Sequence, residues 1–416
     1  MSANGFSFAN PHYTADNFVT YSAAQIDADA NIPTSEEIEE IEPIPAPRIS
    51  PPVMDLGAVL PADALAQISA AGSLVFHSVG DTGGIIRAEP QLAVADAMAA
   101  DLTGKSYGSG LPAFFFHLGD VVYFFGQETY YPEQFYDPYR NYGGPIFAIP
   151  GNHDGVMFEG EAVSYSLEPF IDNFCTPAPQ AGVPGFSRTT MTQPGAYFTL
   201  TAPFARIIGL YSNTGETTGV LSSAAIGTDQ ITFLKQQLAA ALAARTAGKN
   251  PQGLIIAVHH PPFTGSSEHS PSPAMLKAID DCCAQAGIWP DLVLSGHAHL
   301  YERYTRTMSA DGRQIPYVVS GNGGYYNLPG LKKKTDGSKP IAGQHSEPDG
   351  QGNTITLDAY NDTEYGFLRI TVRAATIQVD SLVVSVTTQT SRTSAPPPTT
   401  VDSFTVNLAT HTVTTP

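Results

Sequence analysis

The chain reads LVFHSVGDTG from Leu74 to Gly83, an apolar run followed at once by a Gly-Asp pair. A short run of branched and aromatic residues that ends in glycine is typical of a buried strand, and the aspartate then begins a loop. A single Gly-Asp after a strand is usually an ordinary turn, because glycine supplies backbone freedom and aspartate caps it. This stretch decides the fold because its pattern recurs along the chain.

Four more apolar runs are each followed by side chains that a hard metal ion can use. These motifs are Gly119-Asp120-Val121-Val122-Tyr123, Gly151-Asn152-His153-Asp154, Val258-His259-His260-Pro261 and Gly296-His297-Ala298-His299. The strands predicted before the five motifs are Leu74–Val79, Ala113–Phe116, Pro145–Ile149, Leu254–Val258 and Asp291–Leu294. Independent turns do not explain a His-x-His or an Asn-His at these places. Because ligands at strand ends converge at one edge of an α/β sheet, the motifs together predict a dinuclear metal centre.

The set resembles the motifs of the calcineurin-type metallophosphoesterases, and specifically those of the purple acid phosphatases. Gly83 stands where other branches carry a metal-binding histidine, and Tyr123 resembles the phenolate ligand of the purple enzymes. Tyr301-Glu302-Arg303 is similar to the sequence after the His-x-His in plant-type members, and Ser267-Glu268-His269 resembles a Glu-His of animal-type members. The resemblance spans Leu74 to Val384. It implies an α/β (α+β) fold, a four-layer αββα sandwich of two mixed β-sheets flanked by helices.

The resemblance also implies a ligand set. The first metal would be bound by Asp81, Tyr123 and His299, the second by Asn152, His259 and His297, and Asp120 would bridge them. Two carboxylates, an ionised phenol and a bridging hydroxide would neutralise two divalent ions, leaving little attraction for a phosphate dianion. We therefore expect Fe(III) at the Tyr123 site, and Fe(II), Zn or Mn at the second, imidazole-rich site.

The activity implied is hydrolysis of a phosphoric ester, with an acid phosphatase acting on phosphomonoesters as the first expectation. The mechanism would be in-line attack of a metal-bound hydroxide on phosphorus. The same centre could serve a phosphodiesterase or a nucleotidase, and a metal-binding surface protein without turnover is the alternative from another class. The leaving alkoxide needs a proton, for which His153 is the first candidate and His269 the second.

Two residues are weaker candidates for substrate contact. His260 is adjacent to His259, and only one of two neighbours at a strand end easily faces the same metal. His260 would then contact substrate or fill a polar niche. Asn322, in the sequence Gly321-Asn322-Gly323-Gly324, either helps to bring backbone amides near the metals or belongs to a tight turn.

Charged residues after the last motif leave two further alternatives open. Arg303 either contacts a substrate phosphate or forms a structural ion pair with the neighbouring Glu302. The basic run Lys332–Lys334 is either a solvated loop or a patch that borders a pocket and recruits anions.

Composition limits the partners and the location. The chain has 416 residues, 42% of them hydrophobic, and a net charge of -19. Such an acidic chain opposes stable binding of nucleic acid or anionic membranes, so we expect a small phosphate ester as the partner. The start, Met1–Phe6, has neither a basic region nor an apolar core, and no apolar run approaches membrane-spanning length. The sequence therefore predicts a cytoplasmic protein, or a secreted or periplasmic one if a signal lies outside the chain; it does not predict an oligomeric state.

The domain prediction has three parts. Residues 1–70 read as a proline-rich N-terminal extension, 71–386 as the catalytic domain, and 387–416 as a Thr/Ser/Pro-rich tail with a possible extra strand at Phe404–Leu408. Between the motifs, helical periodicity predicts a helix over Thr228–Arg245 with its buried face at Ile231, Leu234, Leu238 and Leu242. Further strands are predicted at Tyr197–Thr201, Arg206–Tyr211, Tyr317–Ser320, Tyr365–Thr371 and Thr376–Val384.

Overall fold

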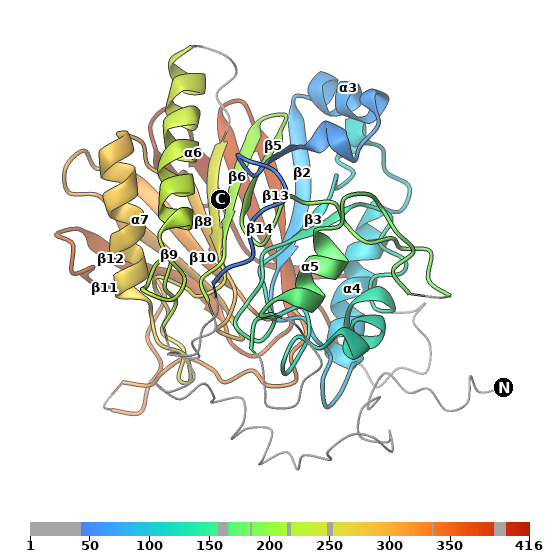
Figure 1. Cartoon of the computed structure of the whole chain (residues 1–416). Coiled ribbons are helices and arrows are strands. Elements are labelled where there is room, and N and C mark those ends of the chain that lie inside the picture. The colour runs from blue at the N-terminus through green and yellow to red at the C-terminus, as the bar shows by residue number, and fades with distance from the viewer. Residues whose placement is uncertain are drawn as a thin grey trace.

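Two mixed β-sheets pack face to face in the computed structural model, with helices outside them (Figure 1). The structure describes residues 43–156, 165–183, 185–213, 218–247, 253–334, 336–386 and 397–416. Helices α6 (Asp229–Thr246) and α7 (Pro273–Ala286) lie side by side on one flank, and α4 (Glu89–Leu102) and α5 (Glu168–Phe174) lie on the other. The predicted sandwich of two mixed sheets flanked by helices is confirmed.

The larger sheet has nine strands in the order β1-β5-β6-β7-β8-β10-β9-β12-β11. In that order they span Val53–Asp55, Phe198–Ala202, Ala205–Leu210, Gly253–Val258, Leu292–Ser295, Gln314–Ser320, Tyr301–Thr307, Thr354–Asn361 and His345–Pro348. The run β6-β7-β8-β10 is parallel, and β9 returns antiparallel to β10.

The smaller sheet has seven strands in the order β16-β15-β14-β13-β2-β3-β4. They span Thr412–Thr414, Thr399–Asn407, Thr376–Val383, Gly366–Arg373, Ser73–Val79, Phe115–His117 and Ile146–Ala148. The strands β2, β3 and β4 are parallel to one another. The five strands predicted to precede the motifs are therefore confirmed as β2, β3, β4, β7 and β8.

The space between the sheets is filled by apolar side chains. Phe116 on β3 stacks on Phe198 on β5 with ring centroids 6.0 Å apart, and both rings are fully buried. A second cluster fills the space under α6 and α7. Burial of these side chains holds the strands rigid, so the loops at their ends start from fixed positions.

The strand ends of the two sheets meet at one end of the sandwich. The amide of Asp81, after β2, donates to the carbonyl of Gly119, after β3, at 2.9 Å. The amide of Gly296, after β8, donates to the carbonyl of His259, after β7, at 2.9 Å. The amide of Gly80 donates to the carbonyl of Ser320, at the end of β10, at 2.9 Å and so joins the two sheets. All five motifs are thereby placed at the same end.

The folded part begins before residue 71, where the sequence places the start of the catalytic domain. Strand β1 pairs in parallel with β5, and helix α3 (Ala62–Ala71) follows it. Met54 and Leu56 are buried in the core cluster. The acidic run Glu36–Glu42 lies outside the described residues. An edge strand of three residues carries too few apolar positions to stand out in the sequence.

At the other end of the chain, the predicted strand at Phe404–Leu408 is confirmed by β15, which pairs with β14 and is followed by β16. The predicted helix is confirmed by α6, but the face that it buries differs from the predicted one. Leu242 is 38% exposed, and Phe233 and Ala241 are buried instead. Gln230 lies on the buried face because its amide pairs with both backbone groups of Tyr211, at 2.8 Å each.

No helix among the described residues is both long and apolar enough to span a membrane.

Candidate metal centre

Three motif residues begin their loops in the left-handed backbone region. The φ angles are 57° at Asp81, 53° at Asp120 and 66° at His297. Each such conformation costs a non-glycine residue about 1–2 kcal/mol. The tight hydrogen bonding around them holds this conformation, and it turns all three side chains back toward the strand ends.

Glycine is required where the loops touch. A Cβ at Gly151 would lie 2.0 Å from Asp120 Oδ1, and one at Gly119 would lie 2.5 Å from His259 Nδ1. Gly119 also has a φ of 97°. These two glycines therefore let Asp120 and His259 come close to the backbone of a neighbouring loop.

One group of side chains is rich in oxygen. The Tyr123 hydroxyl lies 3.3 Å from Asp81 Oδ1 and 3.4 Å from His299 Nε2. His299 Nε2 lies 3.5 Å from Asp81 Oδ1. Asp81 is further fixed by the amide of His297, which donates to its two oxygens at 3.0 and 2.8 Å.

A second group is richer in nitrogen. Asn152 Oδ1 lies 3.0 Å from His259 Nε2 and 3.0 Å from His297 Nδ1. The Nδ1 of His259 lies 2.8 Å from the carbonyl oxygen of Leu118, so it carries the proton and Nε2 faces the site with its lone pair. This is the tautomer that a metal ligand needs.

Asp120 stands between the two groups. Its Oδ2 accepts from the Tyr123 hydroxyl at 3.0 Å and lies 3.3 Å from His259 Nε2. Its Oδ1 accepts from the amide of His153 at 3.0 Å. All seven side chains that the sequence singles out as metal ligands are thus brought together, with the predicted bridge in the middle.

The buried charges of this cluster are poorly compensated. Asp81 and Asp120 are 0% and 1% exposed, and their ion-pair partners among the described residues are histidines. Burial raises the pKa of Asp81 well above its usual range. Burial opposes protonation of His259, but the charges of Asp120 and Asp81 outweigh it and raise the His259 pKa to about 9. In the absence of a cation, a ligand nitrogen would be protonated to neutralise the carboxylates.

The residues present fit a metal ion on chemical grounds. Donor atoms of Asp120, His259 and His297 all lie within 4.8 Å of one another and are buried. Carboxylate, amide and imidazole donors are the set that borderline and hard cations bind. Burial and the carboxylates Asp120 and Asp81 raise the pKa of Tyr123 well above its usual value, so its phenol would ionise only with a cation beside it.

A family comparison agrees with this geometry. The sequence model of the calcineurin-like phosphoesterase family matches residues 79–301, which include all five motifs. The chain belongs to that family. The family depends on a dinuclear metal centre, and the buried cluster lies where the motifs place one.

Similar proteins include phosphatases. Purple acid phosphatase 23 of Arabidopsis thaliana is 25% identical over 226 residues, which are 52% of this chain and 42% of that protein. The chain therefore spans less than half the length of this curated relative.

Solved structures that are similar to this one include GAP50, described as the anchor in the inner membrane complex of Plasmodium. It has a TM-score of 0.49 at 14% identity, over 79% of this chain and 89% of that one. A structure of PhoD has a TM-score of 0.49 at 14% identity, over 89% and 73%. A dimetal phosphatase from Danio rerio has a TM-score of 0.38 at 12% identity, over 74% and 95%.

Within the phosphoesterase centre, Gly83 and Tyr123 fit each other. A Cβ at position 83 would lie 2.6 Å from Tyr123 Cδ2 and 2.3 Å from Gln134 Oε1. Gln134 holds the backbone of Tyr123 from both sides, accepting from its amide at 2.9 Å and donating to its carbonyl at 2.8 Å. A side chain at position 83 and the phenol at position 123 therefore exclude each other in this arrangement.

The residue after the third motif's histidine also has a supporting role. Asp154 accepts from the amides of Val121, Val122 and Gly151 at 2.8 to 3.2 Å. It therefore ties the loops that carry Asp120 and Asn152 to each other.

The two predicted proton donors flank the cluster. The ring of His153 lies 4.6 Å from that of Tyr123, and its Nδ1 lies 2.7 Å from the carbonyl oxygen of Phe124. His269 is half buried, and its ring lies 4.3 Å from His297 and 5.0 Å from His299.

The two weaker candidates occupy structural niches. His260 is fully buried behind His297, and its Nδ1 lies 2.7 Å from the hydroxyl of Ser212. Asn322 is 2% exposed, and its side chain donates to the carbonyl of Glu364 at 3.0 Å. This geometry favours the polar-niche and tight-turn alternatives.

Sequence reasoning missed Tyr325, which follows the glycine turn. Its ring lies 4.4 Å from Tyr123 and 4.2 Å from His299, and it packs with Phe124 and Ile85 in a small apolar cluster. The adjacent aromatic pair after Gly324 was the available signal, but nothing in it indicates which loop it meets.

Proposed function

We propose that the chain is a dinuclear-metal phosphoric ester hydrolase, an acid phosphatase that acts on small phosphomonoesters. The observation that carries the proposal is the position of Asp120 between an oxygen-rich and a nitrogen-rich group of side chains. Asp81, Tyr123 and His299 would hold one ion, Asn152, His259 and His297 the other, and Asp120 both. When bound, the two ions would activate water and neutralise the phosphate charge.

The composition of the two groups supports different ions in them. The first offers a carboxylate and a phenol, which favour Fe(III), and the second offers two imidazoles, which suit Fe(II), Zn or Mn. Tyr123 supports this assignment, because a phenol with a strongly raised pKa ionises only beside a strong Lewis acid. Gln134 holds the backbone of Tyr123, and Tyr325 packs against its ring.

The proposed role of His153 is to protonate the leaving group. Its Nδ1 donates to the Phe124 carbonyl, so Nε2 is the nitrogen that would carry the proton to be transferred. Its backbone amide is held by Asp120, and its ring lies beside Tyr123, where it would reach a phosphate ester bound at the metals. His269, on the outer side of His297 and His299, is the second candidate for this transfer.

The test is the hydrolysis of an aryl phosphate monoester beside its diester, by metal-analysed protein at mildly acidic and neutral pH. We expect a clear monoester preference, strongest in acid, with iron bound and a visible absorption band that the Tyr123→Phe variant lacks. A diester preference would assign the chain to phosphodiesterases. Two bound metals without turnover of either ester would make it a binding protein.

His153 can be tested separately. We expect His153→Ala to lower kcat for alkyl phosphates about 10²- to 10⁴-fold, because an alkoxide must be protonated as it leaves. Activated aryl esters, whose leaving groups are stable anions, should lose far less. Equal losses for both ester classes would remove His153 as the acid, and the same pair of measurements on His269→Ala would test the alternative.

A further inference from the structure

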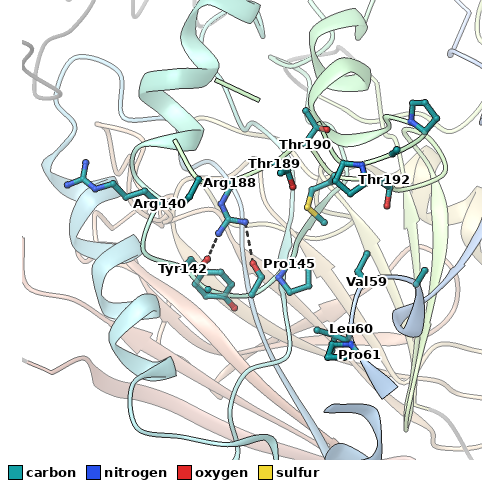
Figure 2. A pocket seen from close by; sticks show the side chains of 18 of the residues that line it. Val59, Leu60, Pro61, Arg140, Tyr142, Pro145, Arg188, Thr189, Thr190 and Thr192 are labelled. Atoms are coloured by element: carbon teal, nitrogen blue, oxygen red, sulfur yellow. Dashed lines mark hydrogen bonds between the residues drawn. The ribbon is translucent and has the colours of Figure 1, made fainter. Parts of the chain in front are cut away.

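Two cavities lie away from the metal centre, and their cations differ. The larger, of about 850 Å³, is lined by Pro61, Tyr142 and Pro145 among others (Figure 2). Its half-buried cation, Arg188, donates to the carbonyl oxygens of Tyr142 and Gly144, as the dashed lines in Figure 2 show. The donors of this guanidinium therefore bind backbone carbonyl groups of the protein itself.

The smaller cavity, of about 280 Å³, lies against the outer face of the nine-stranded sheet. Its walls are apolar: Leu331, Ile355 and Leu357 are buried, and Phe263 is half buried. Tyr304 completes the wall, with its hydroxyl donating to Glu302 at 2.9 Å. Filling a cavity of this kind with an apolar group is favourable, because apolar surface on both sides is removed from water.

Exposed cations stand at this cavity. Lys332–Lys334 line it and are exposed, so that three of the eight lysines of an acidic chain lie at one place. Within the described part of the chain, Lys105, Lys277 and Lys339 each pair with an aspartate, whereas Lys332–Lys334 form no ion pair. One carboxylate, Glu347, also lines the cavity, so the cations outnumber it.

The backbone of the lysine segment is fixed. The amide of Lys332 donates to the carbonyl of Gly265 at 2.7 Å, and the amide of Ser267 donates to the carbonyl of Gly330 at 3.0 Å. Leu331 is held by Asp362, which accepts from its amide at 2.8 Å. The lysines are therefore held next to the apolar walls, although their side chains reach into solvent.

We propose that this cavity binds an amphipathic anion, a small molecule with an apolar body and a carboxylate or phosphate group. The body fills the space between Leu331 and Leu357, and the anionic group meets Lys332–Lys334. Charge complementarity selects an anion over a neutral ligand of the same shape, and the apolar walls select it over free phosphate. The site is separate from the metal centre and does not depend on the activity proposed above.

Calorimetric titration of the metal-loaded full chain tests the proposal. Saturating inorganic phosphate is present throughout, so that a carboxylate does not simply bind the metals. We expect affinity to rise roughly fourfold per methylene from butanoate to octanoate, and then to level off when the cavity is full. Octan-1-ol, which has one more aliphatic carbon and no charge, should nevertheless bind more weakly than octanoate. Equal binding of both, or no gain with chain length, overturns the proposal.

A variant tests the lysines. Lys332→Gln, Lys333→Gln and Lys334→Gln combined should weaken octanoate binding roughly three- to tenfold and leave octan-1-ol unaffected, because glutamine keeps much of the stem but not the charge. Lys277→Gln, at an exposed site on α7, is the matched control and should bind octanoate like the wild type. An unchanged triple variant overturns the assignment. A second outcome would also overturn the proposal. If the protein binds no octanoate but sediments with phosphatidylglycerol vesicles, the lysines bind a membrane surface and not a small molecule.

Discussion

Buried carboxylates are neutralised in two different ways in this molecule. On β9, the fully buried guanidinium of Arg306 pairs with Asp280 at 2.6 Å and with Asp349 at 2.7 Å. On the same strand, Arg303 pairs with Asp402 at 2.6 Å and so ties β15 to the other sheet. At the metal centre, the ion pairs found for Asp81 and Asp120 in the described part of the chain are with histidines.

The difference shows what each cluster is for. Arginine is always charged and brings several donors in a fixed fork, so the β9 cluster is complete without any ligand. Histidine loses its proton when it binds a metal, so the imidazoles at the centre cannot both neutralise the carboxylates and serve as ligands. The first arrangement stabilises the fold, and the second is prepared for a cation from outside.

The largest effect should come from Asp120, which contacts both groups of the centre. We expect Asp120→Asn to lower kcat/KM roughly 10³-fold, since one neutral amide replaces the shared charge that would hold both ions. Metal analysis should show less of both metals, while the free energy of unfolding of the metal-free protein changes little. A variant with full metal content and activity would contradict the bridging role.

The opposite result is expected on β9. Asp280→Asn leaves the guanidinium of Arg306 buried with less charge beside it, which should reduce the free energy of unfolding by about 3 kcal/mol. Denaturant titration measures the loss, and kcat of the metal-loaded protein should not change. Asp281→Asn, one residue away on α7 and paired with Lys277 in solvent, is the control and should cost less than about 0.5 kcal/mol. If the two variants lose equal stability, the buried cluster has no special role.

Local signals explain what the sequence could predict. The strands before the motifs are short apolar runs, and Leu74–Val79, which is followed directly by glycine, or Leu254–Val258 would be buried strands in almost any fold. Once β2 and β3 are parallel neighbours, their loops have to meet, so Asp81 and Asp120 come together without further information. His259 follows β7 in the other sheet and joins them only because the two sheets pack with these strand ends at the same end.

What could not be predicted depends on contacts between distant segments. Strand β9 reads YERYTRT, which has no apolar pattern, because its charged side chains are buried as ion pairs with residues far along the chain. Gln134 and Tyr325 reach Tyr123 only through the tertiary fold. Period-based reasoning has no access to such partners.

The suggested ion pair between Glu302 and Arg303 is wrong, for a geometric reason. Neighbouring residues on a strand point to opposite faces of the sheet. Arg303 therefore meets Asp402 and Asp358, while Glu302 points to the face covered by the loop that carries His269. Glu302 is left as a third kind of buried carboxylate, with neither arginine nor candidate metal beside it.

Neutral donors hold Glu302, and they do not remove the cost of its charge. Its oxygens accept from the Thr264 hydroxyl at 2.7 Å, the Gly265 amide at 2.8 Å and the Tyr304 hydroxyl at 2.9 Å. Burial nevertheless raises the pKa of Glu302 from 4.5 to about 7. The folded state holds this proton more tightly than the unfolded state. The contribution of Glu302 to the free energy of unfolding is therefore fully present below pH 4.5 and is lost as pH rises through about 7.

Glu302→Gln should remove this part of the pH dependence. Compared with the wild type, the variant should gain about 3 kcal/mol in the free energy of unfolding between pH 4.5 and pH 8, because it has no charge to bury. Denaturant titrations of both proteins at the two pH values measure that difference, in which the other titrating groups cancel. The control is Glu364→Gln at an exposed turn, where no such gain is expected. A gain of zero at Glu302 would mean that three neutral donors neutralise a buried carboxylate as well as arginine does, and the contrast between the β9 cluster and the metal centre would lose its physical basis.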